Sequence, residues 1–373
     1  MPSAFTLTLL VGPGIALPAP RDVVDSLTAA QVTVSSGQRS GFQLTFAVAK
    51  DSLLTRVLLP SGYFDPGVRV ILVATVRGVP HVLSDGVITR QESTPANTPG
   101  ASTLTVTGED LSVLMDVIDF QIPYVGLPDI AIVYAILAKY AALGIVPLAI
   151  PPFYMDAPPP TREYRTQTSP DLQMLQELAR RAGYVFYLEP GPAPGVSVAY
   201  WGPEIRVGIP QPALSVNMDA ETNVESLSFS YDGLSKTLPI LFVQIPEAKV
   251  AIPIPVPDVA PWRPPLAVRP AIPLKVELLH DTASMSPGRA IMYGLAKASK
   301  SSDAISGSGT LDVLRYGRPL SARGLVGVRG AGLAYDGLYF VKSVTHSIKR
   351  GEYKQNFTLA REGLIANLPL VRP

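Results

Sequence analysis

The stretch that most constrains this chain is residues 169–188, which reads SPDLQMLQELARRAGYVFYL. Its apolar residues recur at intervals of three and four, which predicts a helix with one buried side; they are Leu172, Leu175, Leu178, Ala179 and Ala182. Ser169 and Pro170 suit the start of a helix, Asp171 favours its positive end, and Gly183 suits a left-handed cap. An apolar strand follows at once, and a proline-rich turn leads to another. We expect a helix packed on a β-hairpin.

Composition limits the classes of function. A chain of 373 residues is long enough for two or three hydrophobic cores. Its net charge of +1 disfavours recognition of nucleic acid or of an anionic membrane. Hydrophobic residues make up 47% and charged residues 16%, which favours either extensive burial against other subunits or a compact β protein with a large core. The absence of cysteine excludes disulfides, thiolate metal sites and cysteine nucleophiles.

Two segments resemble targeting or membrane elements only superficially. Residues 1–12 lack the charge and cleavage pattern of a signal peptide and are expected to form a strand. Residues 130–150 approach the length of a membrane span, but Lys139 lies in the middle and Gly144 stops the helix. We therefore expect a buried helix at 129–143 and no membrane span.

Alternating apolar and polar residues predict a strand-rich first domain over residues 1–120. The expected strands are 5–11, 31–35, 42–49, 68–76, 79–91 and 103–107. Arg77-Gly78 marks a hairpin turn, and residues 109–120 have helical spacing. We interpret this domain as a small β-barrel closed by a helix.

A helical connector and the helix-hairpin unit occupy residues 121–212, with an extended proline-rich run at 147–160. Residues 213–363 form a second predicted barrel, and 364–373 a C-terminal tail. A helix is expected to start at Ser286 and reach about residue 301, and the expected strands are 226–231, 239–245, 310–313, 325–328, 337–347 and 352–361. The predicted class is mainly β with α (α+β).

The second barrel contains a proline-rich insertion at residues 252–273, with eight prolines around Trp262 and Arg263. Such a segment is either a rigid spacer or an arm lying on a neighbouring chain. The second interpretation makes Trp262, Arg263, Ile254 and Val256 candidate protein-interface residues.

No chemical motif predicts catalysis. The histidines are far apart, without metal-ligand spacing, and are interpreted as ordinary strand residues; they are His81, His280 and His346. The glycine-rich segment 327–332 lacks the order and the following helix of a nucleotide loop, so we expect a barrel corner. Glu109 and Asp110 lie at a predicted helix start, which explains them better than a glycosidase pair. We therefore assign no catalytic, cofactor-binding or metal-ligating residue and expect a protein that is not an enzyme.

Four sequence runs resemble the tail hub proteins of contractile phages, the late-control protein D family. These runs are SPDLQMLQELARRAGYVFY (169–187), LDVLRYGR (311–318), GLYFVKSVTH (337–346) and EYKQNFTLAR (352–361). The family is related to the hub region of type VI secretion spike proteins and of extracellular contractile injection systems. The insertion 252–273 is not part of the family pattern.

The resemblance implies two Tudor-like barrels per subunit and a homotrimeric ring that adapts a sixfold tail tube to a threefold central spike. The expected partners are a separate spike protein, a tail tube or tube-initiator protein, and baseplate wedge and tape-measure proteins. It implies a location in the tail baseplate of a virion or in an injection particle, assembled in the host cytoplasm, and no catalytic residues. The alternatives are another cyclic tail component, such as a distal-tail or fibre-attachment protein, and a cell-wall hydrolase or carbohydrate-binding module.

Overall fold

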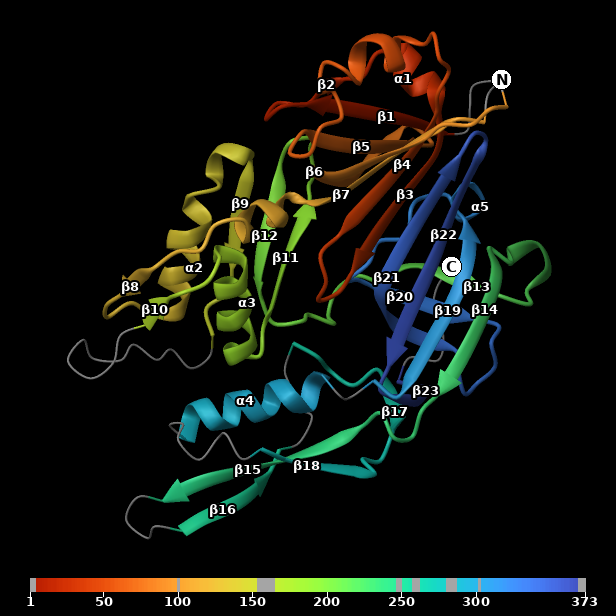
Figure 1. Cartoon of the computed structure of the whole chain (residues 1–373). Helices are drawn as coiled ribbons and strands as arrows, with labels where there is room; N and C mark the ends of the chain where they lie inside the picture. Colours follow the sequence, from red (N-terminus) through yellow and green to blue (C-terminus); the bar gives the residue numbers. More distant parts are fainter. Residues whose placement is uncertain are drawn as a thin grey trace.

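The computed structural model describes residues 5–98, 101–152, 165–245, 250–256, 262–279, 287–300 and 303–367. It is mainly β with a few helices, which confirms the predicted α+β class (Figure 1). His280, Ser286, the proline run 158–160 and residues 368–373 lie outside the described residues. In the described part of the chain, no helix is long and apolar enough to cross a membrane.

The first region is a curved antiparallel sheet with short helical turns at its ends. Its strands are β1 (Phe5–Gly12), β2 (Leu17–Pro18), β3 (Leu27–Ser35), β4 (Gly41–Ala47), β5 (Arg69–Val76), β6 (Val79–Thr94) and β7 (Thr103–Asp110). Its helical turns are α1 (Arg21–Ser26), η1 (Leu54–Leu58) and η2 (Leu111–Asp116). The hairpin turn at Arg77-Gly78 is confirmed, and both residues have the positive φ that such turns require.

The helix predicted at 109–120 is wrong at both ends. Glu109 and Asp110 belong to β7, because Glu109 pairs with Val87 of β6. The Asp110 side chain accepts hydrogen bonds from the backbone N–H groups of Ser112 and Ser40, so it caps a short 3-10 turn that ends at Asp116.

The second region packs helices on a three-stranded sheet. It contains β8 (Ile122–Tyr124), α2 (Asp129–Ala138), η3 (Ala141–Leu143), β9 (Ile145–Ala149), β10 (Arg165–Gln167), α3 (Asp171–Ala182), β11 (Val185–Pro190) and β12 (Ser197–Gly202). The predicted helix-hairpin is confirmed: β11 and β12 are antiparallel, and the Trp201 side chain donates to the carbonyl of Leu175 on α3. Gly183 adopts the expected left-handed cap. The predicted helix at 129–143 stops at Ala138 and continues only as the separate turn η3.

The start of α3 differs from the prediction. Pro170, not Ser169, is the N-cap, and no side chain caps the helix. Asp171 lies in the first turn of α3, where the helix dipole favours it as expected, and it is fully buried. Its carboxylate accepts hydrogen bonds from Lys139 (2.7 Å), Tyr140 (2.8 Å) and Gln167 (2.8 Å), so it ties α3 to α2 and β10.

The third region supplies β13 (Gln211–Ser215), η4 (Asp219–Glu221), β14 (Val224–Tyr231), β19 (Ile305–Asp312), α5 (Val313–Tyr316), β20 (Leu325–Arg329), β21 (Gly337–Lys349) and β22 (Glu352–Arg361). The edges of the first and third regions join, because β3 pairs with β21 from Ser35↔Ser343 to Ala29↔Lys349. The result is one 13-stranded sheet that runs from β14 to β2 with open ends. A continuous apolar core lies under both regions.

The remaining elements form a projection at one end of the molecule, which we call the arm (Figure 1). It consists of β15 (Thr237–Ile245), β16 (Val250–Pro255), β18 (Lys275–Leu279) and α4 (Pro287–Lys300). At its base, β17 (Ala267–Pro270) pairs with β23 (Gly363–Ala366). Residues 364–366, which the sequence analysis placed in the tail, thus lie beside the proline-rich insertion.

Candidate interaction surface

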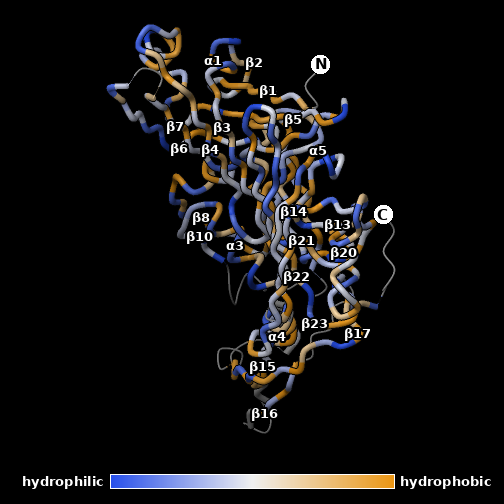
Figure 2. The backbone as a smooth tube through the Cα atoms, turned by 90° about the vertical axis from the view of Figure 1, so that its right-hand side faces the viewer, coloured by the Kyte–Doolittle hydropathy of each residue, from blue (hydrophilic) through white to orange (hydrophobic). Residues whose placement is uncertain are grey.

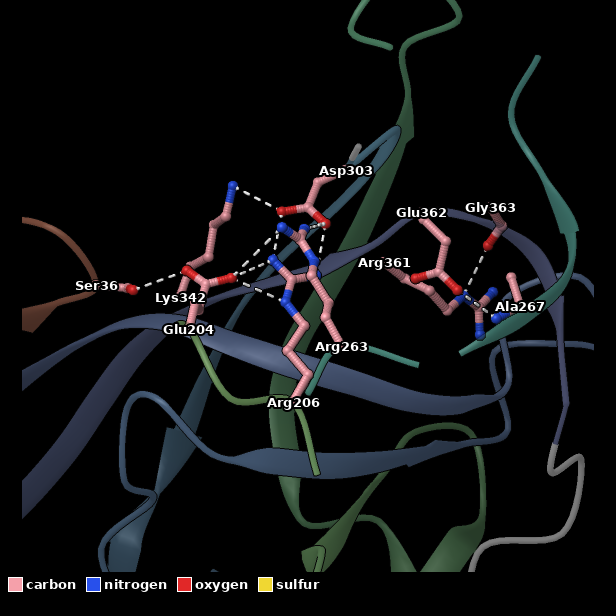
Figure 3. A network of polar contacts seen from close by, with 10 residues as sticks. All are labelled: Ser36, Glu204, Arg206, Arg263, Ala267, Asp303, Lys342, Arg361, Glu362 and Gly363. Atoms are coloured by element: carbon pink, nitrogen blue, oxygen red, sulfur yellow. Dashed lines mark hydrogen bonds and ion pairs between the residues drawn. The ribbon is translucent and has the colours of Figure 1, made fainter. Parts of the chain in front are cut away.

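A buried ion network fixes the root of the arm to the large sheet (Figure 3). Arg206, in the loop before β13, is 2% exposed and donates to both carboxylate oxygens of Asp303, at 2.6 and 2.8 Å. It also donates to Glu204 and lies over the ring of Phe340. Asp303 precedes β19, so this network joins two distant parts of the chain.

The proline-rich insertion enters the same network through Arg263. The guanidinium of Arg263 donates to Asp303 at 3.0 Å, and Lys342 on β21 lies 3.1 Å from the same carboxylate. Burial opposes ionisation of Asp303, but the hydrogen bonds and charge of Arg206, with the charges of Arg263 and Lys342, hold its pKa well below the usual range. The network therefore remains an ionised, mutually dependent set of charges.

A second group of contacts holds β17 against the C-terminal strand. Glu362 accepts a hydrogen bond from the backbone N–H of Ala267 at 2.6 Å, and its carbonyl accepts from Ala271. The neighbouring Arg361 is fully buried over the ring of Tyr339 and donates to three backbone carbonyls. Residues 262–271 are thus attached to the body at both ends.

The four predicted interface residues lie in different settings. Val256 is buried under α4, beside Gly294, and Arg263 is buried in the ion network. Trp262 is half-buried, and its carbonyl accepts from the backbone N–H of Arg206. Ile254 is 38% exposed on β16. The structure brings Trp262 and Arg263 together at the root of the arm, and it places Ile254 in β16 and Val256 directly after that strand. Their role in an interface stays a prediction.

The arm sheet has the strand order β16-β15-β18, and α4 covers one of its faces. Leu241 of β15 pairs with Ile254 and with Leu279, so these three side chains share a face. Leu241, Leu279 and Val256 pack with Ala298 of α4, and Lys297 of α4 binds Glu277. Because α4 also contacts α3, it lies between the arm sheet and the body (Figure 1).

The opposite face of the arm sheet points away from the body and carries apolar side chains that no described element covers. We call it the bare arm face; it comprises Leu238, Ile240, Pro253, Pro255, Val276 and Leu278. Leu278 is 49% and Val276 is 54% exposed, and Ile272 and Leu274 beside them are more exposed still. Figure 2 shows hydrophobic segments at this lower end of the molecule. An exposed apolar face of this kind is a candidate for a protein contact.

Sequence reasoning missed these residues, although a signal was present. Residues 274–278 read LKVEL, a strict alternation in which Leu274, Val276 and Leu278 share one side. The neighbouring prolines indicate an extended spacer or arm around Trp262, so no strand was predicted here. Because the alternation does not say which face α4 covers, only the tertiary structure identifies the bare side.

The described residues offer little for chemistry. Among them, no group of three or more His, Asp or Glu side chains is placed to hold a metal ion. His81 and His346 lie in β6 and β21, as expected of strand residues. Gly327 lies in β20, and Gly330 and Gly332 turn the chain after that strand with positive φ; a Cβ on Gly330 would lie 1.9 Å from the carbonyl oxygen of Val216. That close approach explains why position 330 is a glycine, and no bound nucleotide is needed to account for it.

Comparison with known proteins identifies the fold. No protein family model and no curated protein matches this chain. A tail protein from Neisseria meningitidis MC58 superposes with a TM-score of 0.64 at 14% identity, over 97% of this chain and 98% of that one. The Escherichia coli c3393 protein, described as a type VI secretion component similar to T4 tail proteins gp27 and gp5, gives a TM-score of 0.54 at 14% identity, over 93% and 76% of the two chains.

A chain of the lidded Francisella PdpA–VgrG complex gives a TM-score of 0.59 at 8% identity; the alignment covers 99% of this chain and 54% of that one. The chain therefore has the fold of phage tail proteins and of type VI secretion components, which confirms the resemblance noted in its sequence.

Proposed function

We propose that this protein is the structural hub of a contractile tail or injection particle, a homotrimeric ring between a tail tube and a central spike. The fold, shared over nearly the whole length of a phage tail protein, supports this proposal most strongly. In this proposal the first and third regions act as the two Tudor-like units of each subunit, although they share one open sheet here. Three such pairs give the ring pseudo-sixfold symmetry that suits a sixfold tube.

The bare arm face is assigned to the contact between subunits. A ring closes through head-to-tail contacts, so a projecting surface on one copy must lie on a different surface of the next. The arm projects beyond the body (Figure 1), and its bare face lies on the side of the arm sheet opposite α4. With 16% charged residues, the chain has the composition of a protein that buries surface in permanent contacts.

The remaining partners follow from the same proposal. A central spike binds one side of the ring, the opposite side receives a tail tube or tube-initiator protein, and wedge and tape-measure proteins contact its periphery. The role is structural and not enzymatic, and the protein resides in the tail of a virion or in an injection particle.

The test is the native mass of the purified chain, measured by mass photometry and followed by negative-stain images. We expect a trimer with a central opening. The double substitution V276K/L278K places two charges on the bare arm face and should shift the population to monomer, while circular dichroism and thermal unfolding stay close to those of the parent protein.

Val79 supplies a matched control. It is 54% exposed, as Val276 is, but lies at the β5–β6 turn away from the arm. The substitution V79K should leave the trimer intact. A trimer that survives V276K/L278K would remove the bare arm face from the interface, and a wild-type chain that stays monomeric even with its spike would remove the hub proposal itself.

A further inference from the structure

An apolar depression lies in the large sheet and is separate from the bare arm face. It is a groove of about 600 Å³ between β1, the start of β3, α5 and the tip of the β21–β22 hairpin. Its apolar lining includes Phe5, Leu7, Leu27, Leu314 and Ile348. None of these side chains is fully buried except Ile348, so the groove is open to solvent along β1.

Within the described part of the chain, the edge of β1 beside this groove has no strand partner over half its length. On one side β1 pairs with β5 from Phe5 to Gly12, and on the other β2 pairs only with Leu10 and Val11. The carbonyl of Leu9 accepts from Ala19 on the β2 side, so the backbone groups of Leu9 face that edge. Because backbone direction alternates along a strand, the N–H and C=O groups of Leu7 and Phe5 face the same edge.

This combination restricts what the groove accepts. An occupant must cover apolar side chains and also supply hydrogen-bond donors and acceptors at the spacing of a strand. An extended peptide does both: its backbone pairs with the strand edge, and alternate side chains enter the depression. A compact apolar ligand would leave the amide groups of Phe5 and Leu7 without partners.

The charges at the rim add a further preference. Lys349 and Arg350 are exposed at the hairpin tip that borders the groove, and the facing acidic side chain is Asp25. The rim is therefore net positive. It favours a peptide that carries carboxylates beside its apolar residues.

We propose that β1 is a strand-addition site for an extended, acidic segment of another protein, which pairs with Phe5–Leu7 and places alternate apolar side chains in the groove. The proposal does not depend on the hub role, because β1 belongs to the large sheet and not to the arm.

The experiment uses the full chain and a fluorescein-labelled peptide, Glu-Thr-Val-Thr-Val-Thr-Val-Glu, with binding followed by fluorescence anisotropy. Two further peptides carry N-methyl groups on the valine nitrogens or on the threonine nitrogens. In an added strand only one alternate set of N–H groups meets β1. One methylated peptide should therefore lose about tenfold or more in affinity, and the other should bind within about twofold of the parent peptide.

Equal effects of the two methylated peptides, or no binding of the parent peptide at about 1 mM, would overturn strand addition. The charge-reversal variant K349E/R350E should weaken binding of the glutamate-flanked peptide but not of a version with threonine at both ends. Arg90, exposed on β6 away from the groove, gives the control variant R90E, which should bind both peptides as the parent protein does.

Discussion

His346 illustrates how the core sets the charge of a single side chain. It is buried on β21, its Nδ1 lies 2.7 Å from the hydroxyl of Tyr353, and Gln355 approaches the same nitrogen. Burial, with a smaller contribution from the charge of His81, lowers the pKa of His346 to about 4. The neutral ring accepts at Nδ1, and the hydrogen-bonded trio needs no metal or substrate to explain it.

This pKa predicts a pH dependence of stability. The unfolded chain takes up the proton near pH 6.5, but the folded chain takes it up only near pH 4. The free energy of unfolding is therefore at its full value, as far as His346 is concerned, above pH 6.5, and it falls as the pH drops towards 4. The contribution of His346 to that loss is about 3 kcal/mol. In H346N the amide oxygen replaces Nδ1 as acceptor, and urea unfolding at a series of pH values should show a flatter profile. An unchanged slope would mean that His346 is already protonated in the folded state.

At the scale of elements, the arm depends on a few buried charges at its root. The arm core is small, and its cluster of buried apolar residues comprises Leu241, Val256, Leu279 and Ala298. Its position is set by Asp303, which joins Arg206 of the loop before β13 to Arg263 of the insertion. Removing one member of such a network leaves buried charge without compensation.

The substitution D303N therefore tests the attachment of the arm. The neutral amide removes the carboxylate that Arg206 and Arg263 share and leaves Glu204 as their common acidic neighbour. We expect a loss of about 3–5 kcal/mol in the free energy of unfolding, measured with urea. Hydrogen exchange should accelerate in β15 and β18. The control E177Q breaks a partly exposed pair with Arg181 on α3 and should cost less than about 1 kcal/mol. If D303N matched E177Q, the arm would be held by its apolar contacts alone.

At the scale of the whole molecule, the proposed assembly rests on apolar contact and not on charge. The net charge is +1, and the bare arm face carries no charged side chain. Salt screens ion pairs but does not weaken apolar burial. We expect the trimer to keep its mass in mass photometry when NaCl is raised from about 0.1 to about 1 M. Dissociation over that range would indicate that ion pairs dominate the subunit contact.

The sequence by itself determined the elements whose causes are local. The three-and-four spacing of leucines fixes α3, Gly183 ends it, and Arg77-Gly78 forms a hairpin turn, because each depends on neighbours within a few residues. The same reasoning placed Asp171 at the positive end of α3 but did not indicate its burial, because its partners Lys139 and Gln167 come from segments that local spacing does not reveal.

Only the tertiary structure decided where distant segments meet. Pairing of β3 with β21 joins residues about 300 positions apart and merges two expected barrels into one open sheet. The same long-range packing gathers Arg206, Arg263 and Asp303, chooses the face of the arm that α4 covers, and leaves one edge of β1 open. Periodicity tells which residues share a face of an element, but the partner of that face is set by the path of the whole chain.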